Sequence, residues 1–387
     1  MDADGAVQRQ PAAATQSQNP EQLIRHAQDL LARAKYGEAA AAFEHAEQLE
    51  PREFRQFVNL AFCYVTLGRP ETALRVCERG SEVTPGDSDL HRLRGDALNL
   101  LNRAAEASAA YWQAVAASDY AYTAAESLLL PLVSDPDGSR LLALCDKFPP
   151  AYANCTLVRG FRAIALSRVG RTDEARRLVD LDRHVARVGF EPPSEFGGIE
   201  RFNELLAEEI IRNPVLRHTN VYGFYRTEQL NVAGSRAYPA LAKFLQSAIE
   251  AFIADFPRRG LQTVLPPAPG KGFLRTAGNV VRKEEGHRSH LHKFAYVSGV
   301  YHVAVPHSSE GAHGRAGALV VGSCADVTGG YVPCWGHRDI TPVAGVATLF
   351  PSHIFHSVVP TRSEQPRIAV PFDLGIIATP APRAAAG

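Results

Sequence analysis

The chain has 387 residues, enough for two domains, and an ordinary globular composition with 45% hydrophobic and 21% charged residues. Its 41 basic and 41 acidic residues balance, and this excludes the basic excess of a dedicated nucleic-acid binder. No apolar run is long enough to span a bilayer, so we expect neither a nucleic-acid nor a membrane partner.

The first residues do not have the pattern of a secretory signal. They are rich in Gln, Ala and Pro and lack a basic segment followed by an apolar core, so residues 1–19 are predicted to be a disordered leader. The six cysteines include no CxxC pair and are interpreted as reduced thiols. Together these features predict a cytoplasmic protein.

A repeat of 34 residues runs through the N-terminal half. Small residues recur on that register at Ala39, Ala73, Ala107 and Ala175, and Leu141 interrupts it. A small side chain lets two helices of a hairpin approach closely, and a glycine such as the one in "TLGRPETA" ends the first helix and turns the chain. The pattern predicts paired helices over residues 20–187.

Period and pattern together resemble the tetratricopeptide repeat (TPR), with a degenerate unit near residues 119–152. The resemblance implies an α-helical solenoid, whose stacked hairpins form a concave surface and carry no chemistry of their own. We therefore expect this half to bind a peptide or protein on its concave face, or to dock on the rest of the chain. The sequence leaves both possibilities open.

The second half changes from helices to strands. The segment "VGFEPPSEFGG", residues 188–198, is rich in Pro and Gly and predicts a linker. Helical patterns follow at 199–216 and 238–257, and from about residue 275 the apolar segments become short, β-branched and separated by turns. Some eight antiparallel strands with supporting helices predict a barrel or jelly roll over 199–376, before a disordered tail at 377–387.

Histidines concentrate in this β region, where nine of the fourteen lie between residues 287 and 356. In "GHRSHLHKF", His290 and His292 are two residues apart, and on a strand they would point to one face, as chelation of a metal requires. His356 lies on a later predicted strand. Arg367 opens the strand after it and can form a bidentate pair with a carboxylate. This set predicts a pocket for a metal and a carboxylate.

Other polar residues of the β region are given lesser roles. His302 and Asn279 are candidates for contacts in the pocket, with plain structural roles equally open. Four further histidines fall in polar, Gly-rich segments and are predicted to be surface groups: His287, His307, His313 and His337. A carboxylate for the metal could come from a loop, at Glu284, Glu285 or Asp326.

The order of these residues resembles that of the double-stranded β-helix oxygenases that depend on iron(II) and 2-oxoglutarate. The resemblance implies that His290 and His356 are metal ligands and that Arg367 holds the distal carboxylate of 2-oxoglutarate. His292 stands where the family has an Asp or Glu, so the site would have three histidines, or two histidines and water. The resemblance further implies Fe(II), 2-oxoglutarate and O2 as cofactors.

The implied reaction is hydroxylation of an unactivated C–H bond with release of succinate and CO2, and the repeat half favours a peptide or protein substrate. Two other functions stay open. Three histidines also suit a zinc or other metal hydrolase or hydratase, which gives Arg367 no particular task. A non-catalytic TPR adaptor with a degenerate barrel is the second.

Overall fold

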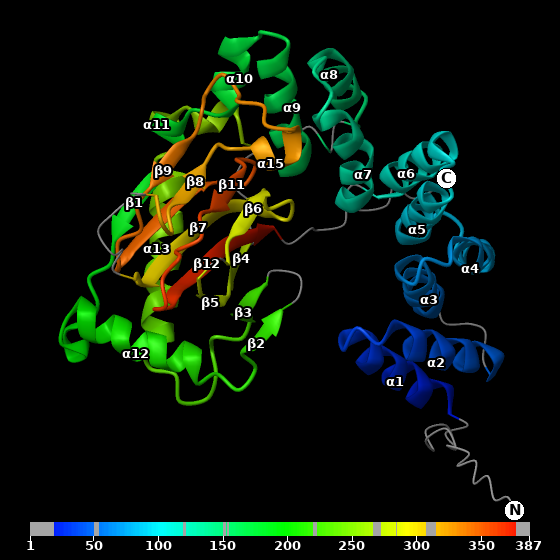
Figure 1. Ribbon diagram of the computed structural model, residues 1–387, viewed down its shortest axis with the longest axis horizontal. Coiled ribbons are helices and arrows are strands. Elements are labelled where there is room, and N and C mark those ends of the chain that lie inside the picture. Colours follow the sequence, from blue (N-terminus) through cyan, green and yellow to red (C-terminus); the bar gives the residue numbers. More distant parts are fainter. Residues whose placement is uncertain are drawn as a thin grey trace, which may run out of the picture. The chain divides into compact units, whose positions relative to one another are not determined.

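The computed structural model describes residues 19–49, 54–118, 121–149, 152, 155–219, 223–265, 272–283, 285–306 and 315–376. The predicted tail, nearly all of the predicted leader, and Glu284, His307 and His313 lie outside these ranges. The chain divides into two compact units, residues 1–125 and 126–387 (Figure 1). None of the helices described is both long and apolar enough to cross a membrane.

The first unit consists of helices that pack against their neighbours in the chain, as the repeat pattern predicts. They are α1 (Pro20–Ala32), α2 (Tyr36–Leu49), α3 (Phe54–Thr66), α4 (Pro70–Val83), α5 (Ser88–Leu100), α6 (Ala104–Ala117) and the first residues of α7 (Tyr122–Val133). Apolar side chains of α1 to α5 form one continuous core.

The 34-residue register continues through the interruption at Leu141. Helices α2, α4, α6, α8 (Gly138–Asp146) and α10 (Thr172–Leu178) begin 34 residues apart, and the fourth residue of each is almost fully buried. Leu141 occupies that position in α8 and is 0% exposed. A residue with positive φ also recurs on the register, at Ala34, Gly68, Asn102 and Gly170. The unit around Leu141 therefore keeps the repeat with a larger side chain at the helix contact.

The later helices belong to the second unit, although their sequence continues the repeat to residue 187. They are the rest of α7, α8, α9 (Thr156–Arg168), α10 and α11 (Leu181–His184). Eleven of the thirteen residues of α9 are buried, and several of them contact the β region. The segment expected to be a linker begins inside a strand, β1 (Ala186–Gly189), which pairs with β10.

Two antiparallel sheets form the rest of the second unit, as expected for a jelly roll. The larger sheet runs β1-β10-β7-β12-β5-β3-β2, with β4 also paired to β12. Besides β1 it contains β2 (Arg217–Thr219), β3 (Phe224–Thr227), β4 (Gly272–Thr276), β5 (Gly278–Val281), β7 (Ala295–Ala304), β10 (Val346–Pro351) and β12 (Arg367–Ile376). The smaller sheet has the order β6 (His287–His290), β11 (His356–Val358), β8 (Leu319–Val321) and β9 (Arg338–Ile340).

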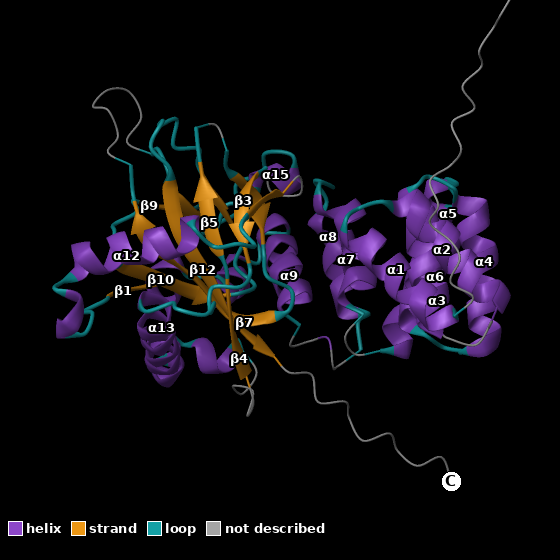
Figure 2. Ribbon diagram, turned by 90° about the horizontal axis from the view of Figure 1, so that it is seen from below, coloured by secondary structure: helices purple, strands orange, loops and turns teal. Residues whose placement is uncertain are grey.

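Helices α12 (Ile199–Ile211) and α13 (Ala237–Ala254) pack on one face of the larger sheet (Figure 2). Side chains alternate along the central strand β7: Tyr301 and Val303 join the core with these helices, and the Tyr301 hydroxyl donates to Asn203 Oδ1 at 2.7 Å. Val300 belongs instead to a second core, which includes residues of the smaller sheet. The short helices α14 (Phe256–Arg259) and α15 (Ala325–Thr328) complete the unit.

Candidate active site

One face of β12 lines a cavity of about 880 Å³ with alternate residues, Arg367, Ala369, Pro371 and Asp373. The residues between them, Ile368, Val370 and Phe372, belong to the core on the opposite face. The two-residue period of a strand therefore turns a guanidinium and a carboxylate into the same cavity, near opposite ends of one strand.

Both sheets contribute to the wall of this cavity. His290, His292, His356, Arg367 and Asn279 all line it, although they come from four separate segments of the chain. His302 lies at 1% exposure behind this wall, where its Nδ1 is 3.4 Å from Arg367 Nη2. The structure thus gathers the candidate residues of the sequence at one cavity, with His302 one contact removed from it.

Three imidazoles converge at one end of the cavity. His290 and His356 are directly opposite each other on β6 and β11, with ring centroids 4.3 Å apart. The His292 ring centroid lies 5.2 Å from that of His290 and 4.9 Å from that of His356. One nitrogen of each ring lies within 4.8 Å of the others, which is a group able to hold a metal ion.

His292 reaches this group without being on the strand that the sequence predicts for it. Strand β6 ends at His290, and the chain then turns. The backbone N–H of His292 donates to Ser352 O at 3.1 Å, in the segment that leads to His356. The expectation of two histidines on one strand face is therefore wrong in its detail, because β6 ends at His290 and a backbone hydrogen bond to Ser352 holds His292 where the second ring meets the first.

The hydrogen bonds of the three rings decide which nitrogens face the centre. His290 Nδ1 lies 2.8 Å from Arg288 O, and His356 Nδ1 lies 3.2 Å from Ile354 O. His292 Nδ1 lies 2.5 Å from Asp373 Oδ1. A carbonyl or carboxylate oxygen accepts a hydrogen bond from an Nδ1–H, so each Nε2 of a neutral ring keeps its lone pair; His292 Nε2 and His290 Nε2 are 3.2 Å apart.

Burial keeps His290 and His356 neutral. Burial, together with the neighbouring His292, lowers the pKa of His290 to about 4, and burial beside His290 lowers the pKa of His356 well below its usual value. Burial also lowers the pKa of Arg367, to about 10, so the guanidinium stays cationic at neutral pH. The cavity therefore combines a cluster of imidazole donors with the buried cation Arg367.

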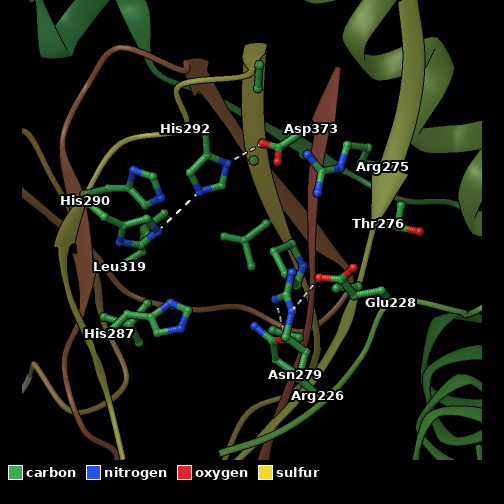
Figure 3. Close-up of a pocket in the computed structure, with 18 of the residues that line it drawn as sticks. Arg226, Glu228, Arg275, Thr276, Asn279, His287, His290, His292, Leu319 and Asp373 are labelled. Carbon is green, nitrogen blue, oxygen red and sulfur yellow. Dashed lines mark hydrogen bonds and ion pairs between the residues drawn. The ribbon is translucent and has the colours of Figure 1, made fainter. Parts of the chain in front are cut away.

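The donor set fits a divalent transition metal, because neutral imidazoles are ligands that iron, zinc, copper and nickel accept. No carboxylate belongs to the group of three. Of the loop carboxylates considered from the sequence, Glu285 accepts from Arg282 N and Asp326 accepts from Ser289 N. Neither lines the cavity. The carboxylate that approaches the group is Asp373, which contacts the outer side of His292 (Figure 3).

Sequence reasoning missed two residues that lie beside the histidine cluster. Asp373 is six residues after Arg367, and this even offset along one strand could have indicated that the two share a face. His287 was expected in a surface loop, but it lies on β6 and lines the cavity, 5.2 Å from His290 between ring centroids. Pairing of β6 with β11 is irregular here, so the odd spacing of His287 and His290 gave no signal.

The other end of the cavity is polar and partly neutralised. Arg226 Nη1 donates to Asn279 Oδ1 at 2.9 Å, and Arg226 Nε lies 3.5 Å from Glu228 Oε1 (Figure 3). The amide oxygen of Asn279 is thus occupied by Arg226, and the Arg226 guanidinium is the charged group at this end of the cavity. Arg226 on β3 is a cavity residue for which the sequence pattern gave no expectation.

Two protein families match separate parts of the chain. Residues 278–373 match the family described as "Putative 2OG-Fe(II) oxygenase", and residues 30–97 match the tetratricopeptide repeat. A search of curated proteins finds no match to the chain.

Solved structures match parts of the chain at low identity. A Pseudomonas putida prolyl-4-hydroxylase is 17% identical, with a TM-score of 0.35, over 52% of this chain and 97% of that one. The first TPR of Spaghetti (RPAP3), bound to an HSP90 peptide, is 20% identical, with a TM-score of 0.28, over 30% of this chain and 93% of that one. The Yersinia enterocolitica secretion chaperone SycD is 19% identical, with a TM-score of 0.27, over 28% of this chain and 87% of that one. By its family matches, the chain carries a tetratricopeptide repeat at 30–97 and a domain of the 2OG-Fe(II) oxygenase family at 278–373.

Proposed function

We propose that the protein is an iron(II)- and 2-oxoglutarate-dependent dioxygenase that hydroxylates a C–H bond of a peptide, a protein or a peptide-like molecule. The observation that carries this proposal is the convergence of three imidazoles on a cavity that also contains the buried cation Arg367, inside a domain of this family. When bound, iron(II) with 2-oxoglutarate and O2 supplies an oxidant strong enough for an unactivated C–H bond, with release of succinate and CO2.

The side chains divide this work among them. His290, His292 and His356 would hold the metal through Nε2, because their Nδ1 atoms are hydrogen-bonded outward. Arg367 is 3% exposed, and within the described part of the chain its Nε has no partner. A buried guanidinium without a carboxylate is costly, so it is suited to receive the distal carboxylate of 2-oxoglutarate.

His302 and Asn279 would support the binding of 2-oxoglutarate by Arg367. His302 Nδ1, 3.4 Å from Arg367 Nη2, limits the positions of the guanidinium, and Asn279 on β5 lines the cavity opposite Ala369 and holds Arg226. In the same proposal the concave face of the repeat recruits a peptide or protein segment, since stacked helical hairpins provide a surface and no catalytic groups. We expect the reaction to take place in the cytoplasm.

The test is metal analysis and succinate release with the full chain, purified without oxygen. The wild type should bind about one iron per chain and release succinate from 2-oxoglutarate only with iron present. His356→Ala should lose both properties. Arg367→Ala should keep the metal and weaken 2-oxoglutarate binding about 30-fold or more, because a buried charge loses its partner. His337→Ala, an exposed histidine outside the cavity, is the matched control and should behave as wild type.

Two results would contradict the proposal and favour the other functions. Stoichiometric zinc with no binding of 2-oxoglutarate favours a three-histidine hydrolase or hydratase. A chain that binds neither metal nor 2-oxoglutarate favours an adaptor whose barrel has no activity.

A further inference from the structure

We propose that Asp373 is a positioning residue of the metal centre, which supplies from behind His292 the negative charge that a carboxylate ligand would otherwise provide. This inference rests on the proposed function, because it assigns a task to a residue of the same site. The sequence pattern of the ligands did not include Asp373, and its place is set by contacts between distant strands.

Asp373 is held in a fixed orientation against His292. Its Oδ1 lies 2.5 Å from His292 Nδ1, and the Ser298 hydroxyl donates to the same oxygen at 2.7 Å. Ser298 Oγ is in turn 2.7 Å from Ser352 Oγ, and Ser352 O accepts the backbone N–H of His292. Ser298 and Ser352 are both 0% exposed. A closed set of hydrogen bonds, anchored on two buried serines, therefore fixes both the partly buried ring and the carboxylate that orients it.

The position of the charge matters as much as the orientation. A centre of two histidines and one carboxylate is less positive by one unit than a centre of three neutral histidines. An anion hydrogen-bonded to the far nitrogen of a ligand imidazole returns part of that charge and makes the imidazole a stronger donor. Asp373 meets this description because its carboxylate contacts Nδ1 while Nε2 of the same ring faces the cluster.

The other carboxylates near the cavity have different partners. Glu228 lies beside Arg226, while Glu285 and Asp326 accept from backbone N–H groups. Arg275 is opposite Asp373 in the pairing of β12 with β4, lines the same cavity and acts on the carboxylate through its charge, which solvent screens because the Arg275 side chain is exposed (Figure 3). Within the described part of the chain, the hydrogen bonds of the Asp373 carboxylate thus lead to His292 or to the serines that support it.

The experiment is a double-substitution cycle read by cobalt(II) binding. Absorption of Co²⁺ in competition with a chelator would give the metal affinity of the full chain, in the wild type, D373N, H292D and the double variant H292D/D373N. Asp373→Asn keeps the shape and an oxygen that can accept from Nδ1 but removes the charge. We expect it to weaken Co²⁺ binding by about 10- to 100-fold, the usual loss for such an outer partner.

The His292→Asp background should shrink this effect. The imidazole through which Asp373 acts is then absent, and the carboxylate at the ligand position supplies the negative charge itself. D373N should therefore change Co²⁺ binding much less in that background than in the wild type. If D373N weakens binding by the same factor in the wild type and in the H292D background, Asp373 is merely structural and the inference is overturned.

Three controls separate the possible failures. Asp339→Asn removes a carboxylate on β9 that pairs with Arg315, and Co²⁺ binding should not change. His290→Ala should abolish Co²⁺ binding, and if it does not, the metal centre itself is wrongly assigned. If His290→Ala abolishes Co²⁺ binding while D373N has no effect, only the Asp373 inference is contradicted. If D373N does not fold, Ser298→Ala replaces it in the test. This variant removes one support of Asp373 and should weaken Co²⁺ binding several-fold. Wild-type Co²⁺ affinity in Ser298→Ala would also overturn the inference.

Discussion

Buried histidines away from the metal cluster make folding of the second unit sensitive to acid. His353 is 0% exposed, its Nε2 lies 2.8 Å from Leu178 O, and burial lowers its pKa to about 3. Burial similarly lowers the pKa of His184 to about 4. Both imidazoles are neutral in the folded chain at pH values where the unfolded chain already binds a proton.

The stability of the metal-free protein should therefore fall as the pH drops below about 6.5, the pKa of an unfolded histidine. Between about pH 6.5 and 4, each such imidazole takes up a proton only on unfolding and removes up to about 1.4 kcal/mol of unfolding free energy per pH unit. His353→Gln keeps an N–H donor but cannot titrate, so the unfolding free energy of this variant should fall less steeply with decreasing pH than that of the wild type. Urea unfolding from pH 8 to 4 measures both unfolding free energies. The same dependence on pH in both proteins would show that His353 is not responsible.

Among the secondary-structure elements, α9 supports the segment that bears His292. Thr156 at its start donates from Oγ1 to His292 O at 3.3 Å or Lys293 O at 3.2 Å. Phe161 packs edge-on against Phe355, at 5.8 Å between ring centroids. At Gly160, a Cβ would lie 2.7 Å from His353 O. A helix whose sequence continues the repeat thus contacts both segments that carry the candidate ligands.

Gly160→Ala tests this support. The added methyl would meet His353 O and Leu291 Cδ2, each at 2.7 Å, and the backbone oxygen cannot give way without moving the segment before His356. We expect a loss of about 1–3 kcal/mol in unfolding free energy, typical of overpacking, and weaker Co²⁺ binding. Gly37→Ala is the matched control, a helical glycine with nothing within 4 Å of the new Cβ, and it should not destabilise the chain. Unchanged Co²⁺ binding in Gly160→Ala would argue against the role of α9.

At the scale of the whole molecule, the division into compact units does not follow the end of the repeat. The second unit begins at Glu126, and its helices make specific contacts with the β region. Glu126 pairs with Lys293 at 2.5 Å, next to His292, and Arg168 donates to Thr328 O at 3.2 Å. A stable version of the second unit should therefore include the helices from α7 onward.

Two truncated chains distinguish this boundary from the one that the sequence suggests. A chain of residues 119–387, which keeps α7 intact, should be soluble, unfold cooperatively and bind Co²⁺ as the full chain does. A chain of residues 188–387 lacks α9 and part of β1, exposes the apolar surface that they cover, and should aggregate or bind Co²⁺ weakly. Solubility, thermal unfolding and metal titration are the measurements. A well-folded 188–387 chain with full affinity would contradict the role of these helices.

Local periodicity made much of the fold predictable. The 34-residue register identified paired helices, and the short apolar segments after residue 275 form strands such as β5, β7 and β12, because these patterns depend on residues close in sequence. The short strands β2 and β3 were not predicted, since their polar residues do not form an apolar run. The order of His290, His356 and Arg367 likewise suggested a pocket before any contact was known.

The sequence by itself therefore determined the two kinds of architecture, the elements and the main candidate ligands. Only the tertiary structure decided that α9 belongs with the sheets, that His287 faces the cavity, and that Asp373 orients His292. The physical reason is that these contacts join residues far apart in the chain; His292 and Asp373 are 81 positions apart. Their meeting depends on strand register and on a turn between strands, which no local pattern of residues specifies.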